Sequence, residues 1–133
     1  MKQIWDPLRK KYVTATPEEQ VRQWFITQLR DLFGVPMGLM MSEAPLTFGL
    51  KKFRADIVVY DRQLRPLLIV ECKRPEVQID AEVSRQALRY NSALDVEFIV
   101  LTNGNLTYLY ERKGESFVPC DKVLSYEEMI CRR

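Results

Sequence analysis

The sequence predicts one α/β domain, in which helices flank a central β-sheet. Short apolar runs bounded by turn residues alternate along the 133 residues with longer segments that carry apolar residues at helical spacing. Hydrophobic residues make up 47% of the chain, enough to supply one core. We therefore expect a single domain over residues 1–133, in the order helix, three strands, helix, two strands.

The first helix is expected from Thr16 to about Phe33. Thr16 suits the N-cap and Pro17 the first helical position, and Glu19, three residues after the cap, would complete a capping box. Apolar residues then follow at helical spacing: Val21, Phe25 and Leu29.

Three strands should follow this helix. Leu39 to Phe48 is interrupted by Pro45, which favours an edge strand or a bent one. Arg54 to Tyr60 and Leu67 to Lys73 are the second and third strands, and the turn between them indicates a hairpin.

The second half of the chain begins with a polar helix, expected from Asp80 to about Leu94. Phe98 to Leu101 is almost wholly apolar, as in a strand covered on both faces. A turn at Asn103 and Gly104 leads to a last strand, Leu106 to Tyr110, and Ser125 could begin a short helix.

The composition limits the chemistry that the chain can perform. It has no histidine, so histidine bases, histidine ligands and Ser-His or Cys-His nucleophiles are excluded. Cys72, Cys120 and Cys131 show no CxxC spacing, which favours reduced thiols over a zinc site or a disulfide framework. The net charge is only +2, so any basic surface for nucleic acid must be local.

The sequence contains no signal peptide, no apolar run long enough to span a bilayer and no P-loop. We therefore expect a cytoplasmic protein without a membrane partner, and no ATP-driven motor within these residues.

Strand alternation brings charged groups together at the centre of the chain. Glu71 and Lys73 lie two residues apart and should share one face of their strand. If Tyr60 and Leu67 close the hairpin, Asp56 lies opposite Glu71, on the face of its strand that carries Val58 and Tyr60. Directly opposed Cβ atoms in an antiparallel pair are only about 5 Å apart.

Two carboxylates at that separation repel each other unless a cation or a proton lies between them. Mg²⁺ suits such a place, with Asp56, Glu71, the backbone carbonyl of Cys72 and a substrate phosphate as oxygen ligands, and Mn²⁺ could substitute. Lys73 could orient or deprotonate an attacking water, or neutralise charge on the phosphate. The pattern favours metal-assisted phosphodiester hydrolysis. The alternative is structural: Lys73 forms salt bridges with both carboxylates.

The segments Arg54–Asp61 (RADIVVYD) and Ile69–Pro75 (IVECKRP) resemble the PD-(D/E)XK nucleases, in particular the N-terminal nuclease domain of type I restriction enzyme R subunits. The resemblance implies a restriction-endonuclease-like core with a mixed central sheet. It also implies that Asp56 and Glu71 bind the metal and that Lys73 acts beside them. Ala55 replaces the proline of the motif, a mild change because that proline supplies no ligand.

The same resemblance implies further site residues. A Gln-x-x-x-Tyr element on the following helix is matched by Gln86 and Tyr90, which share a helix face. An acidic residue from the first helix often completes such sites. Glu18 is our candidate, since Glu19 is already assigned to the capping box, and Glu43 on the first strand is the competing candidate.

Three basic residues precede the active-site strand, namely Lys51, Lys52 and Arg54. They could bind DNA phosphates, or they could be solvated charges of a turn.

The sequence therefore leads to the hypothesis of a Mg²⁺-dependent DNA endonuclease. The alternative is a non-cleaving nucleic-acid-binding or assembly module that retains the nuclease fold. Expected partners are DNA and either a second copy of the chain or other subunits of a restriction system. RNA and branched DNA remain open as substrates.

Overall fold

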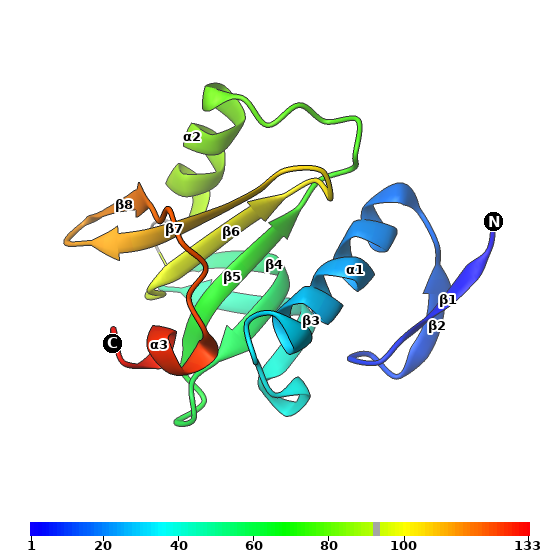
Figure 1. Ribbon diagram of the computed structural model, residues 1–133, viewed down its shortest axis with the longest axis horizontal. Helices are drawn as coiled ribbons and strands as arrows, with labels where there is room; N and C mark the ends of the chain where they lie inside the picture. Colours follow the sequence, from blue (N-terminus) through cyan, green and yellow to red (C-terminus); the bar gives the residue numbers. More distant parts are fainter. Residues whose placement is uncertain (92–93) are drawn as a thin grey trace.

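The computed structural model describes residues 1–91 and 94–133, and its centre is a six-stranded sheet in the order β3-β4-β5-β6-β7-β8 (Figure 1). β5 and β6 are parallel, and all other neighbours are antiparallel. The predicted mixed sheet is confirmed. The strands are β3 (Met40–Phe48), β4 (Lys51–Tyr60), β5 (Pro66–Cys72), β6 (Phe98–Thr102), β7 (Thr107–Lys113) and β8 (Ser116–Pro119).

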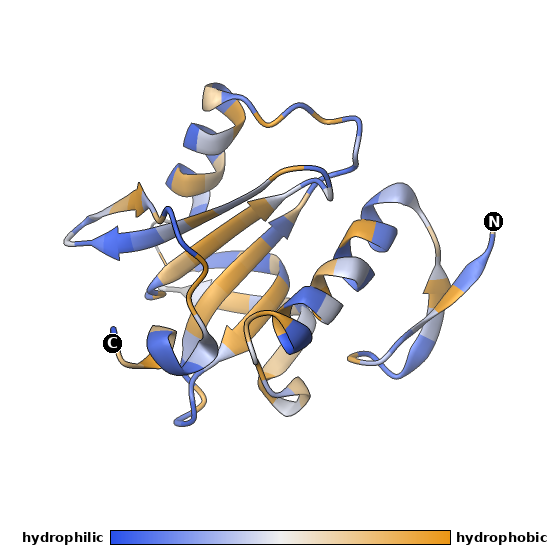
Figure 2. Cartoon of the chain, viewed as in Figure 1, coloured by the Kyte–Doolittle hydropathy of each residue, from blue (hydrophilic) through white to orange (hydrophobic). Residues whose placement is uncertain are grey.

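Helices cover both faces of this sheet. α1 (Pro17–Asp31) and α3 (Tyr126–Ile130) pack on one face, where Phe25 and Met129 share a core with Ile57. The opposite face carries a second core, against which α2 (Ala81–Asn91) packs through Leu88. The apolar strands β5 and β6 lie at the centre, with more polar segments around them (Figure 2). No helix in the described part of the chain has the length and hydropathy needed to cross a membrane.

α1 begins as the sequence predicts, but its cap differs in one respect. The Thr16 hydroxyl accepts a hydrogen bond from the backbone N–H of Glu19 (3.1 Å). The expected return bond of the capping box is absent from α1, because the Glu19 carboxylate binds Arg9 and Gln23 instead. The charge-assisted hydrogen bond from Arg9 takes the place of the return bond.

An N-terminal hairpin was missed by the sequence analysis. β1 (Gln3–Asp6) and β2 (Lys11–Thr14) form a separate two-stranded sheet beside α1 (Figure 1). Trp5 and Tyr12 face each other across it in an edge-to-face contact, with ring centroids 5.2 Å apart. The strands are too short and too polar for a clear period-two pattern.

β3 is an edge strand, as Pro45 predicted. Its pairing with β4 is interrupted at Glu43, which adopts a left-handed backbone conformation with φ of 54°. Ser42 pairs with Ile57 and Ala44 with Ala55, so Glu43 lies opposite Asp56. The interruption of the ladder therefore falls at the candidate site.

The β4–β5 hairpin closes differently from the prediction, yet its register is the predicted one. Tyr60 pairs with Pro66 instead of Leu67, and a bulge follows between Val59 and Tyr60. Beyond the bulge, Ile57 pairs with Val70. The same register would set Asp56 against Glu71 one position farther, but the paired residues end at Ile57 and Val70.

In the second half, the expected helix is shorter and the last strands are longer. The described part of α2 ends at Asn91, and Leu94, where the predicted helix ended, is not helical. Residues 92 and 93, which the prediction included, lie outside the described residues. β7 continues to Lys113 and pairs with the unpredicted β8. The capping box at Ser125 confirms the short last helix.

Candidate active site

Asp56 lies where β4 and β5 part. Its Oδ2 accepts a 2.7 Å hydrogen bond from the backbone N–H of Cys72. Its Oδ1 lies 3.7 Å from Nη2 of Arg22 on α1. Burial raises the pKa of Asp56 to about 6, and the negative charges of Glu18 and Glu43 add to this rise, while the Cys72 N–H and Arg22 oppose it.

The direction of Asp56 departs from simple strand alternation. Ala55 belongs to the core on the α2 side and Ile57 to the core on the α1 side, although two residues apart they should share a face. The left-handed Glu43 opposite Asp56 interrupts the pleat. Asp56 consequently contacts Arg22 of α1, whereas Val58, which was expected to share its face, packs on the α2 side.

Glu71 and Lys73 share the α2 side of the sheet, as predicted. Lys73 Nζ lies 3.0 Å from Glu71 Oε2. Asn91 of α2 donates from Nδ2 to Glu71 Oε1 at 3.4 Å. Glu71, Lys73 and residues of α2 line a pocket of about 380 Å³. Both groups are therefore held and accessible.

The salt-bridge alternative predicted that Lys73 would pair with both carboxylates. In the described part of the chain Lys73 pairs with Glu71, while Asp56 pairs with Arg22. Each carboxylate thus has its own cationic neighbour, that of Asp56 on the α1 side of the sheet and that of Glu71 on the α2 side. The two carboxylates therefore do not share the face on which strand alternation placed them.

The backbone of Cys72 provides a link between the two acidic residues. The N–H and C=O of one strand residue point to the same side, because in an antiparallel pair two opposed residues exchange both of their backbone hydrogen bonds. Since the Cys72 N–H points to Asp56, its carbonyl points to that side too. The neighbouring amide, that of Lys73, points away and donates to Thr102 of β6 at 2.8 Å.

The donor set fits Mg²⁺ in kind: two carboxylates and a backbone carbonyl are hard oxygen ligands, and the histidine and thiolate ligands that zinc favours are missing from this group. Within residues 1–91 and 94–133, no three Asp, Glu, Cys or His side chains lie together so that they could hold an ion by themselves. The ion would therefore need the carbonyl, water or substrate oxygens as additional ligands.

Gln86 and Tyr90 line the same pocket as Glu71 and Lys73. Gln86 is exposed, and its Nε2 donates to Glu82 Oε1 at 3.2 Å. Tyr90 is half-exposed and packs edge-to-face on Phe53 of β4 (5.0 Å). The structure therefore brings both residues of this element to Glu71 and Lys73.

The three acidic candidates for completing the site occupy different positions. Glu18 is half-buried, and its charge raises the pKa of Asp56. Glu19 is buried and binds Arg9 and Gln23. Glu43 binds Arg22 Nη2 at 2.6 Å. Glu18 and Glu43 both act on Asp56, and which of them completes the site stays a prediction.

Arg22 is the site residue that the sequence analysis missed. It is 5% exposed and touches the carboxylates of Asp56, Glu43 and Glu19. A signal existed: Arg22 adjoins Val21 on the apolar stripe of the first helix, where an unpaired charge would be costly.

The basic residues before Asp56 are all exposed, at the start of β4. Lys51 approaches the ring of Phe53, at 6.0 Å from its centroid. Arg54 lies 3.8 Å from Glu43. They are available to phosphates, and whether they bind DNA stays a prediction.

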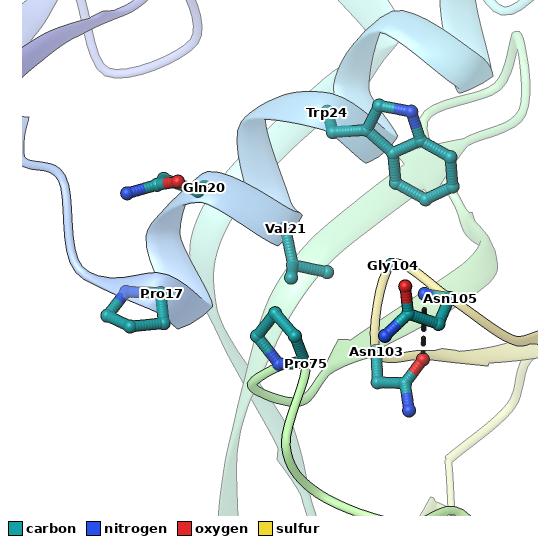
Figure 3. Close-up of a pocket in the computed structure, with 8 residues that line it drawn as sticks. All are labelled: Pro17, Gln20, Val21, Trp24, Pro75, Asn103, Gly104 and Asn105. Atoms are coloured by element: carbon teal, nitrogen blue, oxygen red, sulfur yellow. Dashed lines mark hydrogen bonds between the residues drawn. The ribbon is translucent and has the colours of Figure 1, made fainter.

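A second pocket, of about 300 Å³, lies on the α1 side and contains no acidic side chain (Figure 3). Val21 and Trp24 of α1 line it opposite Pro75 and the turn that holds Asn103. Its lining of amide and apolar groups provides no carboxylate ligand.

Residues 17–123 match the family model of the type I restriction enzyme R protein N terminus. The chain belongs to this family. The match includes both strands of the candidate site, Asp56, Glu71 and Lys73 among them, and leaves out the β1–β2 hairpin. No match is found among curated proteins.

Two solved structures share the fold. One is a fragment of a protein assigned as the HsdR subunit of a type I restriction enzyme from Vibrio vulnificus YJ016, with 17% identity and a TM-score of 0.63 over 90% of this chain. The other is a protein assigned as a nuclease of DUF820 from Anabaena variabilis ATCC 29413, with 12% identity and a TM-score of 0.52 over 92% of this chain. The chain spans 26% of the first structure and 87% of the second.

Proposed function

We propose that this member of the R-subunit N-terminal family is a Mg²⁺-dependent endonuclease domain that hydrolyses phosphodiester bonds in DNA. One observation carries the proposal: the Asp56 carboxylate is bonded to the backbone N–H of Cys72, the residue between Glu71 and Lys73. A buried carboxylate with a raised pKa, bonded to the strand end that carries a second carboxylate and a lysine, is typical of a functional site.

Asp56, Glu71 and the Cys72 carbonyl would hold the ion, with Mn²⁺ as a substitute. Bound Mg²⁺ would supply Lewis-acid stabilisation of the phosphate and a more acidic water. Lys73 would use its ammonium, beside Glu71, to orient the attacking water or to neutralise charge on the scissile phosphate.

The residues of the neighbouring pocket would position the DNA backbone. Gln86 is exposed there and its amide can donate to a phosphate oxygen, once it leaves Glu82. Tyr90 can contact the same strand through its exposed edge. Lys51, Lys52 and Arg54 would supply local positive charge for phosphates outside the pocket.

The family and the length of the HsdR relative suggest the setting in which the domain acts. Because the chain covers only 26% of that relative, further subunits or domains of a restriction system are its proposed partners, with a second copy of the chain as the alternative.

The proposal is tested by incubating purified protein with plasmid, linear duplex, single-stranded and branched DNA, and with RNA. Each substrate is assayed with Mg²⁺, with Mn²⁺ and with EDTA. We expect nicking or linearisation of plasmid DNA with either ion and none with EDTA. DNA binding without cleavage under every condition would instead support the non-cleaving module.

A further inference from the structure

Arg22 is a buried charge among three carboxylates. Its Nη2 lies 2.6 Å from Glu43 Oε1 and 3.7 Å from Asp56 Oδ1, and its Nε lies 3.5 Å from Glu19 Oε2. These acidic residues come from α1, β3 and β4. A guanidinium at their meeting point neutralises charges that would otherwise repel one another.

The guanidinium is poorly satisfied as a hydrogen-bond donor. Nε and Nη1 of Arg22 are buried and have no hydrogen-bond partner in the described part of the chain. Arginines that serve purely to hold a structure together typically use their fork of donors in bidentate pairs. The position of Arg22 is therefore determined by the charge of the surrounding carboxylates more than by directional bonds.

The two oxygens of Asp56 face different partners. Oδ2 is bonded to Cys72 on β5, and Oδ1 is the atom near Arg22. An ion held by Asp56 and Glu71 at the end of β5 would thus have the Arg22 charge on the other side of the same carboxylate. Arg22 and the divalent ion, both positive, would therefore compete for the negative charge of Asp56.

We propose that Arg22 is the resident counter-cation of the metal site. It is a positioning residue that keeps Asp56 and Glu43 together before the ion arrives, and that lowers the affinity of the site for a divalent ion. This inference rests on the proposed function, since it concerns the same metal site.

The N-terminal hairpin fixes this arrangement from outside. Glu19, which is buried, accepts a 2.7 Å hydrogen bond from Arg9 Nη2 on its Oε1, and its Oε2 faces Arg22. Arg9 also pairs with the fully buried Asp6 of β1. A chain of alternating negative and positive side chains thus connects the hairpin to Asp56. The hairpin lies outside the region matched by the family model.

The experiment measures Mn²⁺ binding by calorimetry and by electron paramagnetic resonance, without DNA. Arg22→Gln removes the counter-cation, and Glu19→Gln/Arg22→Gln removes one buried charge of each sign, which favours folding. Arg30→Gln, on the same helix but exposed and paired with Asp31, is the matched control. Asp56→Asn shows whether the bound ion is at this site.

We expect Arg22→Gln to bind Mn²⁺ about tenfold more tightly or better, the scale of removing a unit charge a few ångströms from a divalent ion in a partly hydrated site. The double variant should bind several-fold more tightly, and Arg30→Gln like the parent. Asp56→Asn should abolish binding. If the single variant does not fold without metal, Mn²⁺ should restore its fold, because the ion replaces the missing cation.

Equal or weaker Mn²⁺ binding by a folded Arg22 variant overturns the inference and leaves the metal-dependent function standing. The inference is also overturned if both the single and the double variant are unfolded and Mn²⁺ does not restore their fold. By contrast, a parent protein that binds no Mn²⁺ at millimolar concentration rejects the metal site itself, and with it the proposed function.

Discussion

The Asp56 carboxylate accepts a hydrogen bond from the backbone N–H of Cys72, 2.7 Å away on the neighbouring strand. The bond ties the start of the apolar part of β4 to the Glu71–Cys72–Lys73 segment at the end of β5. Burial of the carboxylate raises its pKa, and the bond to Cys72 opposes that rise.

Glu71→Gln should abolish cleavage and leave the fold intact, because the substitution preserves shape and removes one ligand charge. Plasmid cleavage and thermal melting are measured together, with Glu115→Gln, an exposed change at the β7–β8 turn, as control. Cleavage at the parental rate by a variant with the parental melting temperature would reject Glu71 as a ligand.

Lys73→Ala should lower cleavage by about 10² or more, the scale of a positioned acid-base or electrostatic group. It should bind Mg²⁺ and DNA at least as well as the parent, since Glu71 loses a competing cation 3.0 Å away. Cleavage, Mg²⁺ binding and melting with and without Mg²⁺ are the measurements. Lys122→Ala, at an exposed position, is the control.

A purely charge-neutralising Lys73 would behave differently. The variant would then be destabilised without metal, be rescued by Mg²⁺, and cleave as the parent does. That combination would exclude a catalytic role for Lys73.

The metal-free protein should lose stability as the pH rises through 6. The folded-state pKa of Asp56 is raised from 3.8 to about 6, so between these values the folded state binds more protons than the unfolded state. The ionised carboxylate then costs about 3 kcal/mol of unfolding free energy at neutral pH, as an upper value.

Asp56→Asn removes this titration while keeping an oxygen that can accept from Cys72. Urea unfolding in EDTA between pH 4 and pH 8 should show the parent losing stability with rising pH relative to Asp56→Asn. Parallel pH profiles for the two proteins would contradict the raised pKa.

Lys51→Ala and Lys52→Ala should weaken DNA binding similarly for all sequences. Each should also reduce the slope of log K against log salt by about one if that lysine contacts a phosphate. Binding titrations at several salt concentrations, with EDTA to prevent cleavage, provide the slopes. An unchanged slope in both variants would make these lysines solvated charges at the start of β4.

Local sequence patterns predicted the core of the fold and most of the register of the hairpin that carries the candidate site. Apolar runs around Val58 and Val70 identify buried strands, and strand alternation places Glu71 and Lys73 on one face, as the structure confirms. The register was also correct where Ile57 pairs with Val70, although Tyr60 closes the hairpin with Pro66. These features depend on neighbours along the chain or across one turn, so the local pattern contains them. The expected common face was not formed, since Asp56 turns to the α1 side and Glu71 to the α2 side.

The surroundings of Asp56 depend on contacts between segments that are far apart in the sequence. Arg22 and Glu43 reach it from α1 and β3, and no local pattern predicts which segments meet there. The interruption at Glu43 turned Asp56 toward α1, and Arg9 drew Glu19 out of its capping box. These contacts join segments that are distant in the sequence, because a buried carboxylate binds the cation or N–H that the folded chain brings nearest.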